Sequence, residues 1–539
     1  MILSSSCTLD LPTRPQLSLH AGWSSLIGKT MTSNKPRPPC RLDALFQGLT
    51  MRRCKTDAKR RVVGLCTDSR RASPGVVFFA LNGLRTDGNS YLEEAVNRGA
   101  VAIVSERPPE ANQNGWARYR SITYLQVKDS RAVLAEVARR FYGQPQEALD
   151  ITAVTGTNGK TTVAYLVKHL LSSAEERVGM LGTIQYDLGR RTLPAYRTTP
   201  DAVDLYGMLA QMRDTGCHRT VMEVSSHAIA QQRVEGLGFK VAAFLNLTRD
   251  HLDYHDTLEN YFATKSRIFT GIVGPLPEIA VIHGDDTYGQ RLATMLPGDV
   301  KVICFGEGSG CAMRATDLRL DANGVRFTLC SPEGVFSVHS HLPGRYNISN
   351  IMAALTIAYA QGGNLGECIE RLASFPGVPG RMERVDAGQA FSVFVDYAHT
   401  DDALTNALTM LRAITPGRLL VVFGCGGNRD REKRPLMTQA ALNGADYCWA
   451  TADNPRSEAV SAIFDDMRQG MLDLDRICFV EDRRRAIFLA LEAAQEGDCV
   501  LIAGKGHETF QEFNGSVIPF DDRLTARQML EHYAHRVAD

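Results

Sequence analysis

The chain has 539 residues, which is too long for a single hydrophobic core, so about three domains of ordinary size are expected. Its sixty basic residues balance sixty acidic ones, which excludes the overall positive charge that would attract nucleic acid or an anionic membrane surface. No run of about 18 apolar residues occurs, so no membrane span is predicted. Thirteen cysteines, an odd number without zinc-type spacing, favour reduced thiols in a cytoplasmic protein.

The N-terminal stretch differs in composition from the rest of the chain. It is rich in Ser, Leu and Pro, poor in acidic residues, and lacks the continuous apolar segment of a secretory signal. We expect a disordered extension over residues 1–45, which would fit translation that begins upstream of Met31. A segment resembling a transit peptide is the alternative.

An alternation of strands and helices begins near Val62. Apolar runs and helical periodicity predict strands at 76–81, 101–104 and 124–127 and helices at 91–98 and 130–141. Gly143-Gln144-Pro145 is typical of a linker. We therefore expect an N-terminal domain over residues 46–147, whose polar turns are, taken alone, ordinary turn chemistry.

The stretch from Ile151 to Thr162 has the form of a phosphate-binding loop. A β-prone run leads into Gly156-Thr157-Asn158-Gly159-Lys160-Thr161-Thr162, and helical periodicity follows. In such a loop the glycines let backbone N–H groups approach phosphate oxygens, Lys160 supplies a charge for the terminal phosphates, and the Thr161 hydroxyl can hold Mg²⁺. The usual form would have glycine where Val154 stands. A purely structural turn is the alternative, but the strand–helix context favours a nucleoside triphosphate site.

Further strands alternate with helices after this loop. We expect strands at 221–224, 241–245, 279–282 and 302–305. Such alternation predicts a mostly parallel sheet with helices on both faces and functional residues at the carboxyl ends of its strands. Glu223 lies at one such end, and Mg²⁺ is a natural partner for a buried carboxylate there.

A second polar stretch, residues 246–255, follows the next strand and is rich in Asp and His. A simple helix-capping loop is the alternative to a functional site. Lys265, about one helix further on, is from the residues alone an ordinary surface lysine. Residues 315–342 change to a period of two, which predicts an antiparallel hairpin or meander added to the parallel sheet. A linker at 377–383 then closes a central domain over residues 148–380.

A third αβ unit is expected over residues 381–539. Its strands are predicted at 391–396, 419–423, 447–450, 477–480 and 499–502. Arg429, Arg456 and Glu508 follow three of these strands. They could bind a zwitterion, because a guanidinium pairs with a carboxylate and a carboxylate with an ammonium group. Solvated loop charges are the alternative.

Taken in order, the motifs of the chain resemble those of the Mur ligase family. They read G-T-N-G-K-T, E-V-S-S-H, N-L-T-R-D-H-L-D-Y-H, G-R-Y-N, G-R-M-E, D-Y-A-H-T, G-C-G-G-N-R-D and D-N-P-R. The resemblance covers roughly residues 60–530. It implies an α/β protein of three domains, with a central P-loop domain built on a parallel sheet and flanking Rossmann-like N- and C-terminal domains.

The resemblance also implies a function. Mur ligases are ATP- and Mg²⁺-dependent acid–amino-acid ligases of peptidoglycan precursor synthesis, and so serve cell-wall growth, cell shape and cell division. The chain most resembles the members that add meso-2,6-diaminopimelate to UDP-N-acetylmuramoyl-L-alanyl-D-glutamate through an acyl phosphate. This implies a cytoplasmic monomer with small-molecule substrates and no nucleic-acid or membrane partner.

Carried over position by position, the family's motifs imply four groups of site residues. Catalysis and metal binding would fall to Lys160, Thr161, Glu223, His251 and a carbamylated Lys265. Residues 156–162 would bind ATP together with Asn347, Arg381 and Asp396. The UDP-sugar peptide would contact Thr67, Ser69, Leu84, Arg85, Thr86, Thr198, Thr199, Ser225, Gln231 and Arg233. The incoming diaminopimelate would contact Arg429, Asp453, Asn454, Pro455, Arg456, Gly504 and Glu508.

Arg456 bears on specificity, because the D-N-P-R form is associated with diaminopimelate, whose distal carboxylate can pair with the guanidinium. Lysine-adding relatives lack that arginine. The loop Leu84-Arg85-Thr86 departs from the His-Gln-Ala of some members, which leaves the uridine contacts open.

Three alternatives stay open. A lysine-adding ligase would share most motifs. Folylpolyglutamate synthase would share the phosphate loop but lacks the D-N-P-R segment and an N-terminal domain of this kind. A non-catalytic scaffold of a plastid transcription complex would fit the Ser-rich leader, but it has no physical need to keep Lys160, Glu223, Lys265, Arg429 and Arg456.

Overall fold

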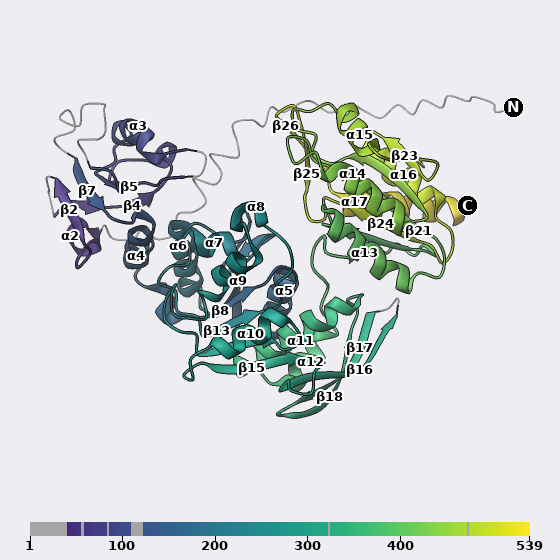
Figure 1. The fold of residues 1–539 in the computed structure, drawn as a ribbon, viewed down its shortest axis with the longest axis horizontal. Coiled ribbons are helices and arrows are strands. Elements are labelled where there is room, and N and C mark those ends of the chain that lie inside the picture. Colours follow the sequence, from purple (N-terminus) through teal and green to yellow (C-terminus); the bar gives the residue numbers. More distant parts are fainter. Residues whose placement is uncertain are drawn as a thin grey trace.

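The computed structural model describes residues 40–54, 59–83, 86–108, 122–321, 324–471 and 474–538. These residues form three bodies, each built around its own main sheet, with the central body between the other two (Figure 1). The alternation of strands and helices predicted along the chain is confirmed, and the class is α/β. No helix among the described residues is both long and apolar enough to cross a membrane.

The N-terminal body holds a five-stranded sheet. Its order is β2 (Met51–Cys54), β7 (Thr123–Val127), β6 (Ala102–Ser105), β5 (Val76–Ala80) and β4 (Gly64–Cys66). All neighbours are parallel except β2, which runs antiparallel to β7. The longer helices of this body are α3 (Leu92–Asn97) and α4 (Ser130–Phe141), and short 3₁₀ turns lie at Ser69–Arg71, Gly88–Tyr91 and Pro145–Ala148.

The expected extension over residues 1–45 needs a correction at its end. Residues 1–39 lie outside the described part, but Cys40–Arg41 form strand β1, which pairs with β3 (Arg61–Val62), and Leu42–Leu45 form helix α2. Leu42 and Leu45 are each 3% exposed and belong to the same apolar core as β5 and α4. The ordered domain therefore begins before residue 46, because these two leucines are needed to close its core.

The central body is built on an eleven-stranded sheet. Its order is β11 (Thr192–Pro194), β10 (Gln185–Asp187), β9 (Arg177–Leu181), β12 (Cys217–Glu223), β8 (Asp150–Thr155), β13 (Val241–Phe244), β14 (Ile279–His283), β15 (Lys301–Gly306), β16 (Met313–Asp321), β17 (Gly324–Ser331) and β18 (Gly334–Ser340). The strands from β9 to β16 are parallel, and the predicted antiparallel meander is confirmed as β16–β18. The antiparallel strands β10 and β11 were not predicted.

Helices cover both faces of this sheet. They are α5 (Lys160–Leu171), α6 (Ala202–Asp214), α7 (Ser226–Ala230), α8 (Leu252–His255), α9 (Leu258–Ser266), α10 (Thr287–Met295), α11 (Arg345–Ala360) and α12 (Leu365–Leu372). Strand β8 is buried along nearly its whole length, as expected for the middle of a parallel sheet. Its carboxyl end therefore opens into the centre of the domain.

The C-terminal body has a six-stranded sheet. Its order is β19 (Glu383–Arg384), β20 (Ser392–Asp396), β24 (Cys499–Ala503), β21 (Leu419–Cys425), β22 (Tyr447–Ala452) and β23 (Ile477–Val480), all parallel except β19. Its helices are α13 (Asp401–Ile414), α14 (Lys433–Gly444), α15 (Val460–Arg468), α16 (Arg483–Ala493) and α17 (Asp522–Ala538). A hairpin of β25 (Phe510–Phe513) and β26 (Ser516–Pro519), which the patterns did not predict, packs beside Arg456.

Candidate active site

The phosphate-binding loop lies between β8 and α5, as predicted. Gly159 precedes the helix with a φ of +87°, and a Cβ there would come within 2.3 Å of the Asn350 side-chain oxygen, so only glycine fits. Asn246 accepts the backbone N–H groups of Thr157 and Asn158 at 3.0 and 2.9 Å. The N–H groups of the first turn of α5 have no partner within the helix and can bind an anion.

Glu223 ends strand β12 directly beside this loop. Its carboxylate is fully buried and accepts hydrogen bonds from the Thr161 hydroxyl at 2.9 Å, the Thr183 hydroxyl at 3.0 Å and the Thr183 backbone N–H at 2.8 Å. Sequence analysis missed Thr183, because it lies in a loop without a motif of its own. These bonds hold the Glu223 carboxylate with one oxygen beside the Thr161 hydroxyl. A small cation could be bound there by that carboxylate oxygen and the hydroxyl oxygen together.

Two lysines converge on the carbonyl oxygen of Gly156. Lys160 Nζ donates to it at 3.0 Å and Lys265 Nζ at 2.9 Å, although Lys265 comes from α9. The view of Lys265 as a surface lysine is wrong, since it is 1% exposed. Burial, and then the charge of Lys160, lower the pKa of Lys265 well below its usual range. Burial also lowers the pKa of Lys160, so both amines give up their protons more readily than a lysine in water does.

His251 lies in a group of aromatic rings that reaches Lys265. Its ring centroid is 4.9 Å from that of His227 and 6.2 Å from that of Tyr261, and Lys265 Nζ lies 4.7 Å from the Tyr261 centroid. His251 has a φ of +53° at the start of α8, which is an uncommon conformation for this residue type. Among the described residues, no three His, Cys, Asp or Glu side chains form a ready-made metal site.

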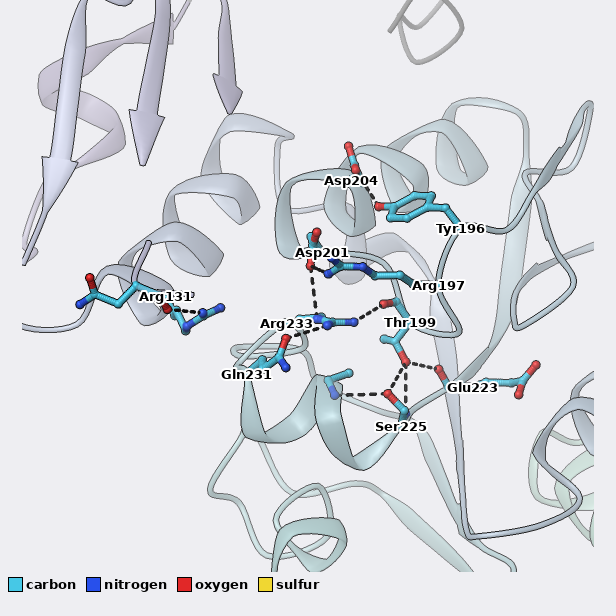
Figure 2. Close-up of polar contacts among 12 residues, drawn as sticks. Arg131, Tyr196, Arg197, Thr199, Asp201, Asp204, Glu223, Ser225, Gln231 and Arg233 are labelled. Atoms are coloured by element: carbon cyan, nitrogen blue, oxygen red, sulfur yellow. Dashed lines mark hydrogen bonds and ion pairs between the residues drawn. The ribbon is translucent and has the colours of Figure 1, made fainter. Parts of the chain in front are cut away.

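A row of polar side chains leads from Glu223 toward the N-terminal domain (Figure 2). The Thr199 hydroxyl donates to the Glu223 carbonyl at 2.9 Å and accepts from the Ser225 backbone N–H at 3.1 Å, and Thr198 pairs with Thr183 at 3.1 Å. Arg233 continues the row. It donates to the Thr199 carbonyl at 3.0 Å and to the Gln231 side chain at 2.6 Å. These predicted substrate residues therefore lie together.

At the Arg233 end of this row two arginines share one carboxylate, and a third arginine lies near them. Arg197 and Arg233 both pair with Asp201, at 2.7 and 3.3 Å, and Arg131 approaches from α4 of the N-terminal domain (Figure 2). Burial lowers the pKa of Arg233; the charge of Asp201 opposes this shift, and the charges of Arg197 and Arg131 add to it. The excess positive charge makes this end of the row suited to an anionic substrate.

Thr67 and Ser69 follow β4 in the N-terminal domain, just before Arg71. Ser69 is buried and donates to Glu94 at 2.6 Å. Arg71, two residues on, pairs with Asp204 of the central domain at 3.2 Å. Thr86 is exposed, and the predicted contacts Leu84 and Arg85 lie outside the described residues.

The predicted nucleotide contacts meet where the central and C-terminal domains join. Asn347 is buried at the start of α11 and accepts a hydrogen bond from Asn350 at 2.9 Å. Sequence analysis did not identify Asn350, although a position three residues after Asn347 on one helix places the two side chains on the same face. Arg381 lies over the Tyr397 ring at 4.7 Å, and its charge lowers the pKa of Lys160. Asp396 accepts the backbone N–H groups of Met382 and Ala398, and burial raises the pKa of its carboxyl group.

The predicted amino-acid contacts come together at the carboxyl ends of β21, β22 and β24. A Cβ on Gly426 would lie 3.1 Å from Arg456 Nη1 and 3.7 Å from Arg429 Cγ, so the two arginines converge. Asn454 donates to Glu508 at 2.9 Å. A Cβ on Gly504 would lie 2.9 Å from the Asp453 carboxylate, and Pro455 is buried.

Lys505 completes this group and was not predicted. It is fully buried and donates to Glu508 at 2.9 Å and to Asn454 at 3.2 Å. Lys505 belongs to the segment G-K-G-H-E, in which the sequence alone does not distinguish a buried lysine from a solvated loop lysine. Apart from Cys40, the cysteines whose side chains are described are free thiols.

Comparisons with known proteins agree with this geometry. Residues 61–142 match the Mur ligase family catalytic domain, 154–358 the Mur ligase middle domain, and 380–506 the glutamate ligase domain of Mur ligases. The chain is 44% identical to the UDP-N-acetylmuramoyl-L-alanyl-D-glutamate–2,6-diaminopimelate ligase of Solibacter usitatus, over 89% of this chain and 95% of that protein. It is 43% identical to the ligase of the same name from Geobacillus thermodenitrificans, over 86% and 94%.

A solved structure of a ligase with that name superposes with a TM-score of 0.65 at 34% identity, over 92% of this chain and all of that one. Folylpolyglutamate synthase of Mycobacterium tuberculosis shares the fold at 20% identity and a TM-score of 0.57, over only 69% of this chain. With three matching domains and relatives of this identity along nearly its whole length, the chain belongs to the Mur ligase family.

Proposed function

We infer that the chain is an ATP-dependent ligase that adds meso-2,6-diaminopimelate to UDP-N-acetylmuramoyl-L-alanyl-D-glutamate in peptidoglycan precursor synthesis. The observation that carries this inference is the meeting of the phosphate loop, the Thr161–Glu223 pair and buried Lys265 at one point. That point lies in a chain aligned over most of its length with ligases that carry this name. The row from Glu223 to Arg233 supports a path for the acidic peptide substrate.

The chemical problem is that a carboxylate does not react with an amine, because its oxygen is a poor leaving group. In the proposed first step, an oxygen of the D-glutamyl side-chain carboxylate attacks the γ-phosphorus of ATP. The bond to the bridging oxygen breaks, and ADP leaves. Lys160 and the N–H groups at the start of α5 stabilise the phosphoryl charge.

In the second step, the neutral amine of diaminopimelate attacks the carbonyl carbon of the acyl phosphate. The tetrahedral intermediate collapses, phosphate leaves with the bonding electron pair, and the surplus amine proton passes to it. Arg429, Arg456 and Glu508 would orient the amino acid by pairing with its carboxylate and ammonium groups. Asn347, Arg381 and Asp396 would hold the nucleotide.

Mg²⁺ fits the residues beside the phosphate loop. The oxygens of Thr161 and Glu223 lie 2.9 Å apart, and magnesium commonly takes one or two protein ligands together with phosphate oxygens. When bound, the ion neutralises charge on the phosphates. A second ion would need His251 and a carbamylated Lys265, since a free amine is a poor magnesium ligand. Only a neutral amine reacts with carbon dioxide, and the lowered pKa of Lys265 favours that form.

Phosphate release with ATP, Mg²⁺ and UDP-N-acetylmuramoyl-L-Ala-D-Glu tests the proposal. We expect turnover with meso-diaminopimelate and little with L-lysine or without an amino acid. Preference for lysine would keep the ligase and overturn the specificity. No turnover by folded protein that binds ATP would favour a non-catalytic scaffold. Because ATP and UDP-sugars are cytoplasmic metabolites, we propose that the protein acts in the cytoplasm. We also propose that it is a monomer, which would elute in gel filtration at the size of one chain.

A further inference from the structure

Two loops carry the arginines of the proposed amino-acid site. The first follows β21 and includes Gly426, Gly427 and Arg429; the second follows β22 and includes Pro455 and Arg456. They touch backbone to backbone, since the Gly427 N–H donates to the Asn454 carbonyl at 2.9 Å and a Cβ on Gly427 would lie 1.8 Å from the Pro455 oxygen. Their relative position therefore sets the spacing of the two guanidinium groups.

Arg434, at the start of α14, forms hydrogen bonds to the first loop and to the residue that follows the second loop. Its side chain is 1% exposed. Nη2 donates to the Gly426 carbonyl of the first loop at 3.2 Å and to Glu458, just after the second loop, at 2.7 Å. Nη1 donates to Asp466 of α15 at 2.7 Å. One buried guanidinium thus joins the two loops to two helices.

Glu458 extends this connection back to the first loop. Its carboxylate also accepts the Asn428 backbone N–H at 2.7 Å, and the Asn428 side chain accepts from the Ser457 backbone N–H and hydroxyl at 3.1 and 2.8 Å. Burial would raise the pKa of Glu458, but the bonds from Asn428 and Arg434 outweigh it and lower the pKa. We call Arg434, Glu458, Asp466 and Asn428 the loop brace.

The backbone of both loops needs such support. Asn428 and Arg456 have φ values of +53° and +54°, a region that residues other than glycine seldom occupy and that persists when surrounding contacts hold it. Arg456 is also fixed from the other side, where its N–H donates to the Glu512 carbonyl at 2.9 Å and its carbonyl accepts from Asn514 at 2.6 Å. The loop brace supplies the corresponding hydrogen bonds to the loop that carries Arg429.

We propose that Arg434 is a positioning residue of the amino-acid site, which fixes the loop of Arg429 against the loop of Arg456 and so selects a substrate with two carboxylate groups. It does not touch the substrate itself. The inference rests on the proposed function, because it assumes that the two arginines bind the incoming amino acid.

Steady-state kinetics of the full chain test this role, with Arg434→Gln as the main variant. We expect KM for meso-diaminopimelate to rise about ten- to a hundredfold, because small misplacements of binding groups are costly, while KM for ATP stays within about twofold. Arg434→Lys should recover part of the loss, since it keeps the charge but can reach fewer partners. A merely structural role would lower the amount of active enzyme and leave KM for all substrates unchanged.

The matched control is Arg431→Gln. Arg431 pairs with the same Asp466 carboxylate at 2.8 Å, but its side chain is 67% exposed, and we expect KM for diaminopimelate to stay within about twofold of wild type. If Arg434→Gln does not fold, Glu458→Gln takes its place, with a smaller rise in the same KM expected. An unchanged KM for diaminopimelate in an active variant, or an equal rise for ATP, would overturn the inference alone. A wild type without diaminopimelate-dependent turnover would overturn both it and the proposed function.

Discussion

The central domain meets its two neighbours in different ways. On the N-terminal side the two domains share one apolar core, in which α4 and β5 pack with α6 and β8. Arg71–Asp204 at 3.2 Å and Gln232–Asp129 at 2.9 Å cross the same boundary. On the C-terminal side, both apolar cores are built from residues from Met382 onward. One junction is fused and the other joins separate cores.

Two glycines allow close approaches at the C-terminal junction. Gly380 has a φ of +63°, and a Cβ there would lie 2.0 Å from the backbone nitrogen of His507. A Cβ on Gly344 would lie 2.7 Å from Met410 of α13. A domain with its own core and one linker can move as a unit. The difference predicts that the N-terminal junction keeps one arrangement, whereas the C-terminal domain can change its position relative to the phosphate loop.

The largest effect is expected at Lys265, which bonds to the phosphate loop in the central domain. Lys265→Ala should lower kcat about a thousandfold or more, because it removes the charged group that stabilises the reacting phosphate at this loop. ATP should still bind. Short carboxylic acids should restore part of the activity if the lysine acts as a carbamate. Phosphate release measures both. Lys240→Ala, which breaks a pair with Asp150 at the start of the strands, is the control, and a fully active Lys265→Ala enzyme would refute the role.

A smaller effect is expected on the free energy of unfolding, and its dependence on pH should show which junction is sensitive to acid. Burial, and then the charges of Arg381 and Arg523, lower the pKa of His507 from 6.5 to about 4. Between these values the unfolded chain binds a proton that the folded chain excludes, so the free energy of unfolding falls as pH drops below 6.5 and is unaffected above it. At pH 5, wild type should lose about 2 kcal/mol more than His507→Gln, relative to pH 7.

Urea unfolding at the two pH values measures this difference. The exposed His218 provides the control variant His218→Gln, which should behave as wild type. Equal acid sensitivity of wild type and His507→Gln would show that the C-terminal junction is not the acid-sensitive one.

The smallest effect is expected at the fused junction. Arg71→Gln removes a cross-domain pair whose arginine is 43% exposed, so it should cost about 1 kcal/mol of stability. Because the shared core remains, KM for the UDP-sugar peptide should rise only a few fold and KM for ATP should not change. Arg70→Gln, which loses only a local pair with Asp68, is the control. A rise in KM for ATP as large as that for the peptide would show that the two junctions are not independent.

The sequence by itself determined the features that depend on local pattern. The phosphate loop, most of the parallel strands, the meander at 315–342 and the linker near Gly380 all follow from hydrophobic period and glycine placement, which act within a few residues. The family motifs then grouped the remaining site residues, and the structure brings the members within its described part together near the two junctions.

Only the tertiary structure decided which charged side chains are buried. Lys265 bonds to Gly156, 109 residues earlier, and Arg434 joins loops that follow two different strands. No local pattern distinguishes these residues from solvated Lys and Arg, because burial is created by segments that are distant in sequence. The same holds for Leu42 and Leu45, whose core also contains residues of β5 and α4. Packing, rather than spacing, gives these side chains their environment and so their chemistry.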